Sequence, residues 1–85
     1  MNEELEIFKK KLLYRASYRG TKEMDILLSA FVKKHIENFD LNYLNELENF
    51  LKFDDEIISN FYNHNKIERD IDKNQISKIF KDFKI

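Results

Sequence analysis

Residues 11–31 read KLLYRASYRGTKEMDILLSAF, and this stretch decides the fold class. Apolar side chains recur in it every three or four residues, which is the period of an α-helix with one buried face. A single break interrupts the pattern at Gly20, the only glycine of the chain. Because glycine costs about 1 kcal/mol relative to alanine inside a helix, we predict two helices that meet at a corner there.

The same period defines the two helices on either side of this corner. The first is expected over residues 3–17, and the second is expected to begin near Thr21 as its N-cap. The apolar residues predicted to face the core from these two helices are Leu5, Phe8, Leu12 and Ala16, followed by Met24, Leu27, Leu28 and Phe31.

Three further stripes predict three more helices. One should follow Asp40 as its cap, one should run from Asp54 or Asp55 to a stop at residues 63–65, and the last should cover about residues 73–83. Their predicted core residues are Leu44, Leu47, Phe50, Leu51, Ile57, Ile58, Phe61, Tyr62, Ile76, Ile79, Phe80 and Phe83. A small β-protein normally needs Gly and Pro for its turns, and proline is absent here. We therefore expect an all-α compact bundle of about five short helices, formed by one domain over residues 1–85.

The composition of the chain excludes several classes of function. The chain has no cysteine, which excludes disulfides and thiolate chemistry. Its 15 basic and 16 acidic side chains give a formal charge of −1, which argues against non-specific nucleic-acid binding. No apolar run approaches the roughly 20 residues of a membrane span, and the N-terminus does not resemble a targeting signal. We expect a cytoplasmic, monomeric protein, and the abundance of Lys, Asn and Ile suggests a bacterial source.

Candidates for catalysis are few. His35 and His64 fall near predicted helix C-termini, where the helix dipole favours a cation, and neither has a metal-ligand partner at helical spacing. The acidic run Asp54–Glu56 is interpreted as helix capping and solvated charge. Phosphate-binding glycine loops and nucleophile elbows are absent from the sequence. The chain is therefore not expected to be an enzyme.

The corner carries the most unusual charge pattern. Lys11, Arg15 and Arg19 repeat every four residues and would lie along one side of a helix that reached Arg19, and Glu23 and Asp25 follow the glycine. Gly20 would let another backbone approach closely between these opposite charges. From these residues alone, a binding site and a structural turn remain equally good interpretations.

At these residues the sequence resembles the succinate dehydrogenase flavinylation factors, a family called succinate dehydrogenase assembly factor 2 in mitochondria. The family's RGxxE motif corresponds to residues 19–23, and its following aspartate corresponds to Asp25. A looser second match involves Glu48, Phe50, Leu51, Asp54 or Asp55, and Phe61. Tyr18 stands where many members have an arginine, and Phe61 stands where tryptophan is usual.

The resemblance implies a chaperone-like assembly factor with a fold of about five helices. Such a factor binds the flavoprotein subunit of succinate dehydrogenase and promotes covalent attachment of FAD to it. FAD is then the cofactor of the partner, and none is bound stably by the factor itself. The flavoprotein of fumarate reductase stays open as a second partner. The partner-binding residues expected on this basis are Arg15, Arg19, Gly20, Glu23 and Asp25.

Two other functions remain as alternatives. The chain could be a helical protein-interaction module for another enzyme. Separately, the structural alternative to partner contact by Arg19 and Glu23 is that the two pair with each other on the surface. The chain could also be a helical nucleic-acid binder that contacts phosphates through basic side chains of its first helix. The balanced net charge disfavours this second alternative.

Overall fold

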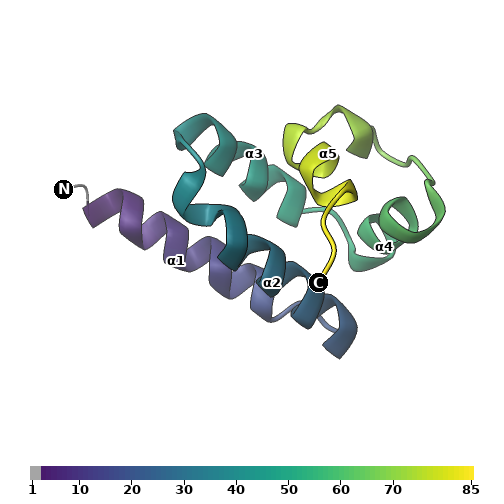
Figure 1. Cartoon of the computed structure of the whole chain (residues 1–85), viewed down its shortest axis with the longest axis horizontal. Helices are drawn as coiled ribbons and strands as arrows, with labels where there is room; N and C mark the ends of the chain where they lie inside the picture. Colours follow the sequence, from purple (N-terminus) through teal and green to yellow (C-terminus); the bar gives the residue numbers. More distant parts are fainter. Residues whose placement is uncertain (1–2) are drawn as a thin grey trace.

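A computed structural model of the chain describes residues 3–85, and this part forms the expected all-α bundle (Figure 1). The described residues contain five α-helices and two 3-10 helices, and no strand. In chain order they are α1 (Glu3–Ser17), α2 (Lys22–His35), η1 (Ile36–Asn38), α3 (Leu41–Leu51), α4 (Asp55–His64), η2 (Ile71–Lys73) and α5 (Gln75–Lys81).

The helices form a hairpin with a second layer packed against one side of it. α1 and α2 lie side by side, and α1 also packs against α3 (Figure 1). α5 packs against both α3 and α4, so α3 connects the hairpin to the C-terminal half. None of the helices within residues 3–85 combines the length and the apolar character that a membrane crossing requires.

Polar residues at the helix ends set most of the boundaries. The side chain of Thr21 accepts a hydrogen bond from the backbone N–H of Met24, and Asp40 accepts one from that of Tyr43. Asn65 ends α4 in the left-handed conformation, with φ of 56°. These three boundaries confirm the sequence predictions, because each depends on contacts within a few residues.

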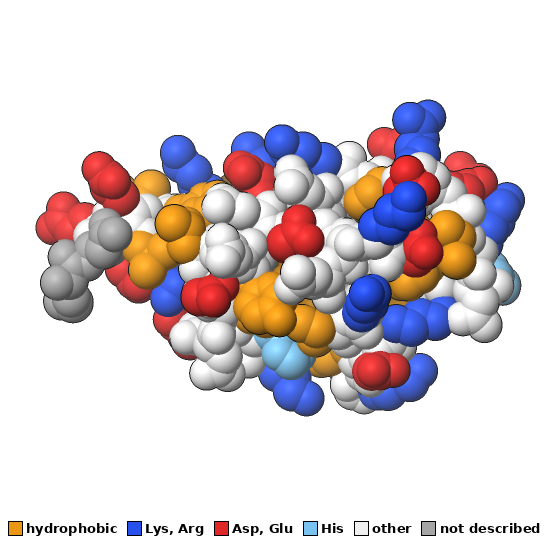
Figure 2. Space-filling model, turned by 90° about the horizontal axis from the view of Figure 1, so that it is seen from above, with side chains coloured by type: hydrophobic (Ala, Val, Ile, Leu, Met, Phe, Trp, Pro, Cys, Tyr) orange, Lys and Arg blue, Asp and Glu red, His pale blue; other side chains and the backbone are white. Residues whose placement is uncertain are grey.

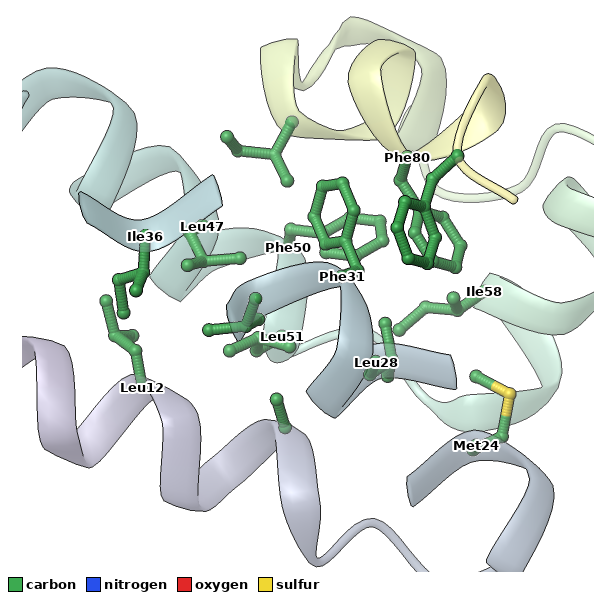
Figure 3. Close-up of a cluster of buried hydrophobic side chains, with 14 of the residues drawn as sticks. Leu12, Met24, Leu28, Phe31, Ile36, Leu47, Phe50, Leu51, Ile58 and Phe80 are labelled. Carbon is green, nitrogen blue, oxygen red and sulfur yellow. The ribbon is translucent and has the colours of Figure 1, made fainter. Parts of the chain in front are cut away.

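The core is a single cluster with phenylalanine rings at its centre (Figure 3). The ring of Phe80 lies 5.1 Å from that of Phe31 and 5.3 Å from that of Phe50, measured between centroids. Edge-to-face and tilted pairs of this kind add about 0.5–1.5 kcal/mol to the burial of each ring. The cluster therefore joins α2, α3 and α5 directly.

Several predicted core residues are only half-buried, because they lie at the margins of the helix faces that pack. These residues are Leu5, Phe8, Leu27, Tyr62 and Ile79. The sequence prediction also missed buried residues in the connections between helices. Ile36 of η1, Phe39 after it and Ile71 of η2 all belong to the core. Their elements are too short to show a helical period.

The last helix is shorter than predicted. Residues 73–83 were expected to be helical, whereas α5 covers Gln75–Lys81. The side-chain oxygen of Asn74 accepts hydrogen bonds from the backbone N–H groups of Ile76 and Ser77, at 2.8 and 3.3 Å, and so begins the helix. Phe83 is nevertheless buried, because its ring packs against that of Phe31, with 5.4 Å between the centroids. The hydroxyl of Tyr62 also donates to the backbone carbonyl of Phe83.

Candidate functional site

The corner between α1 and α2 is formed by residues 18–21, and Gly20 gives it its shape. Gly20 has φ of +153°, which side-chain-bearing L-residues rarely adopt. A Cβ atom added there would lie 3.4 Å from Oδ2 of Asp55. Within the described residues, the nearest atom to this position thus belongs to a side chain, whereas the approach of a partner's backbone stays a prediction. The conformation itself explains why this residue is glycine.

Arg19 lies outside α1, which ends at Ser17, so only Lys11 and Arg15 of the predicted basic stripe share one helix. The Arg19 side chain turns inward and is 10% exposed. Its Nε donates to Oδ1 of Asp55 at 2.8 Å, and its two terminal nitrogens donate to the carbonyls of Leu51 and Phe53 at 2.5 and 2.6 Å. All three guanidinium nitrogens are thus engaged within the chain, and they tie the corner to the connection between α3 and α4.

Asp25 closes the corner from the other side. Its carboxylate accepts a hydrogen bond from the backbone N–H of Arg19 at 2.5 Å. The residue lies in the first turn of α2, where the helix dipole stabilises an anion. Asp25 and Asp55 therefore hold the backbone and the side chain of Arg19, respectively.

The other predicted partner-binding residues face solvent. Arg15 is half-exposed, and its Nη1 lies 3.6 Å from Oε2 of Glu48, a surface pair worth less than about 1 kcal/mol. Glu23 is exposed in the first turn of α2 and has no ion pair within the described residues. Gly20 is exposed as well. Of the five predicted residues, Arg19 and Asp25 therefore hold the corner in place. Arg15, Gly20 and Glu23 are exposed at the corner or beside it.

Sequence reasoning missed the partner of Arg19. Asp55 was interpreted as capping or solvated charge, and an Arg19–Glu23 surface pair was the structural alternative, yet Arg19 pairs with Asp55. Asp54 does precede α4 as its N-cap residue, without a side-chain cap hydrogen bond. The second block of the family resemblance, which includes Asp54 or Asp55, was the one available signal. No local spacing links two residues 36 positions apart.

His35 is the last residue of α2 and packs among aromatic rings. Its ring lies against Phe31, Phe39 and Phe83, with centroid distances of 5.0, 5.7 and 6.3 Å. Burial among these rings, and then the charge of Lys34, lowers the pKa of His35 below the ordinary value of 6.5. His35 thus lies at the helix C-terminus that the sequence predicted, and burial disfavours its charged form there. Within residues 3–85, no group of three potential ligands could hold a metal ion.

The chain is thus a small helical bundle whose corner is held by an arginine that is largely shielded from solvent. This arginine follows the first helix and precedes a glycine. A sequence model of the family described as the flavinator of succinate dehydrogenase matches residues 10–84. The chain belongs to this family, which confirms the resemblance seen at residues 19–25.

The chain is also similar to curated proteins named as succinate dehydrogenase assembly factors. Succinate dehydrogenase assembly factor 2-B, mitochondrial, of Drosophila simulans is 42% identical over 50 residues, which cover 59% of this chain and 32% of that protein. Assembly factor 2-A, mitochondrial, of Drosophila yakuba is 53% identical over 38 residues, covering 45% of this chain and 24% of that protein. The matched stretch thus spans about a third or less of these relatives. No solved structure matches the chain.

Proposed function

We propose that this chain is an assembly factor that binds the flavoprotein subunit of succinate dehydrogenase and promotes covalent attachment of FAD to it. The observation that carries the proposal is the family match over residues 10–84, which includes the whole corner. Bond formation belongs to the flavin and its host protein, so the factor itself needs no catalytic residue. FAD is accordingly the partner's cofactor.

A rigid corner suits this role. The three side-chain hydrogen bonds of Arg19 and the backbone contact to Asp25 hold residues 18–21 in one conformation. A surface that is ordered before binding loses less conformational entropy when the partner docks. By holding the flavoprotein in one arrangement, such a surface can raise the rate of a reaction that it does not itself catalyse.

The predicted site residues differ in their exposure to solvent, and we assign them different roles accordingly. Arg15, Glu23 and the exposed backbone at Gly20 are accessible, and we assign direct contact with the flavoprotein to them. Arg19 and Asp25 are engaged within the chain, and we assign to them the positioning of the corner. This differs from the expectation that Arg19 and Glu23 contact the flavoprotein directly, with Arg15 and Asp25 in support.

Co-expression with the candidate flavoprotein tests the function. The flavoprotein subunit of succinate dehydrogenase is produced with and without this chain, and covalent flavin is measured by in-gel fluorescence at equal flavoprotein level. We expect a marked increase when the chain is present, and a smaller one with Glu23→Ala. An equal signal with and without the chain would contradict the proposal. The flavoprotein of fumarate reductase, expressed in parallel, tests the second partner.

Other predictions stay open beside this proposal. The monomeric state and the bacterial cytoplasmic location are still predictions, since the relatives named above are mitochondrial. Size-exclusion chromatography with light scattering tests the first of them. Titration of the purified chain with free FAD tests the expectation that it binds no cofactor stably.

A further inference from the structure

The helix α1 has a second apolar stripe on the side opposite the core. Ile7, Tyr14 and Tyr18 are separated by seven and four residues, so they follow one face of the helix. The backbone N–H of Tyr18 donates to the carbonyl of Tyr14 at 3.2 Å, which keeps Tyr18 on the helical path although α1 ends at Ser17. We call these three residues the outer stripe. Leu12 and Ala16, in contrast, point into the bundle.

The outer stripe is exposed. Tyr14 and Tyr18 are 66% and 70% exposed, and Ile7 is also among the exposed large apolar side chains. The two tyrosine rings lie 4.7 Å apart and form one aromatic surface. Because α1 lies at the edge of the bundle, the other helices cover it from one side only (Figure 1). Tyrosine is enriched at the energetic centres of protein interfaces, since it contributes a large area at low entropic cost.

Two lysines lie beside the outer stripe and have no ion pair within residues 3–85. Lys10 and Lys11 occupy the turn between Ile7 and Tyr14, four and three residues before Tyr14. Both are exposed, and neither has an ion pair within residues 3–85. The neighbouring Lys9 shows the contrast, because its Nζ lies 2.9 Å from Glu37 and 3.6 Å from Glu6. An apolar surface with uncompensated positive charge is complementary to a surface that carries acidic and apolar groups together.

We propose that the outer stripe is the docking surface for an acidic, partly apolar surface of the flavoprotein subunit; this rests on the proposed function and extends its site from the corner along α1. Apolar groups of the partner cover Tyr14 and Tyr18, and its carboxylates pair with Lys10 and Lys11.

Two other occupants fit less well. In a symmetric antiparallel dimer through α1, Lys10 and Lys11 of one copy would lie close to the same lysines of the other, and like charges disfavour that contact. An anionic membrane fits less well because the outer stripe has only one aliphatic side chain, Ile7, to insert into lipid. On the face of the molecule seen from above, basic and acidic groups are interspersed (Figure 2).

The test is the affinity of purified variants for the purified flavoprotein subunit. Combining Tyr14→Ala with Tyr18→Ala should raise Kd by about tenfold or more, as expected for central interface aromatics. Lys11→Glu should weaken binding at low salt, and its difference from the wild type should shrink as salt is raised. The matched controls are Leu41→Ala combined with Ile67→Ala, which are similarly exposed apolar residues, and Lys78→Glu. Both controls should bind as the wild type does.

The possible outcomes distinguish a failure of the docking surface from a failure of the proposed function. If the wild type binds and the tyrosine double variant binds equally well, the outer stripe is not the docking surface, although the proposed function stands. If the wild type does not bind, the proposed function fails and the partner assigned to the stripe fails with it. Sedimentation of the wild type, but not of the tyrosine variant, with phosphatidylserine vesicles would overturn the protein partner in favour of a membrane. Circular dichroism melts confirm that every variant is folded.

Discussion

Nε of Arg19 lies 2.8 Å from Oδ1 of Asp55, and this pair joins the corner after α1 to the start of α4. The two side chains are largely shielded from solvent, and the remaining guanidinium nitrogens donate to the carbonyls of Leu51 and Phe53. A charge in such a place is costly to leave unpaired. The arginine of the motif is therefore a structural part of the bundle, whatever surface the corner presents to a partner.

Arg19→Ala is expected to lower the free energy of unfolding by about 2–4 kcal/mol, because it leaves Asp55 and two carbonyls without their donor. Arg19→Lys should lose a smaller part of this, since an ammonium keeps the charge but not the planar fork. Urea unfolding measures both changes. Arg15→Ala is the control, because the exposed Arg15–Glu48 pair should contribute less than about 1 kcal/mol. Equal effects at the two arginines would contradict the buried role of Arg19.

Gly20→Ala is expected to destabilise the fold by about 1–2 kcal/mol, since its φ of +153° is strained for a residue with a Cβ atom. Gly20→Val should cost more, because its branched side chain approaches the Asp55 carboxylate. Thermal melting by circular dichroism measures the change, and Lys22→Ala serves as an exposed neighbour. An unchanged melting temperature for Gly20→Ala would show that the corner relaxes.

His35 is expected to make stability depend on pH. Its folded-state pKa is lowered by burial and by Lys34, so the unfolded chain binds the proton more tightly. The stability that His35 contributes is complete above the unfolded value of about 6.5 and is lost as pH falls from there through the folded pKa. Between pH 7 and pH 5, the free energy of unfolding should therefore depend less steeply on pH in His35→Phe than in the wild type. Urea unfolding at a series of pH values measures this dependence, and an unchanged dependence in His35→Phe would contradict the prediction.

Ser77→Ala is expected to leave stability unchanged or to raise it by up to about 1 kcal/mol. The hydroxyl of Ser77 is fully buried in α5 and has no hydrogen-bond partner within residues 3–85. Removing it eliminates the desolvation cost of an unpaired polar group, and alanine also favours a helix. Chemical denaturation provides the measurement. Ser17→Ala is the matched control, because it removes the hydrogen bond from Ser17 Oγ to the carbonyl of Leu13 at 2.8 Å. A clear loss of stability in Ser77→Ala would indicate a partner for this hydroxyl.

Local sequence determined the helices. The apolar period predicted the stripes of α1 to α4, and capping residues placed several boundaries, because a cap contacts the backbone only two or three residues away. Thr21 and Asp40 act in this way. Gly20 marked the corner for the same reason, since its backbone preference is a property of one residue. The family motif at residues 19–23 was also readable without a structure.

Tertiary structure alone decided what those residues do. The partner of Arg19 lies 36 residues away, and only the packing of α4 against the corner brings Asp55 to it. Burial among rings from three separate segments lowers the pKa of His35, although its position at a helix end favours a cation. The exposure of Tyr14 and Tyr18 likewise depends on which side of α1 the other helices cover. Helix ends follow from contacts a few residues long, whereas ion pairing, ionisation and exposure depend on neighbours that only the folded chain supplies.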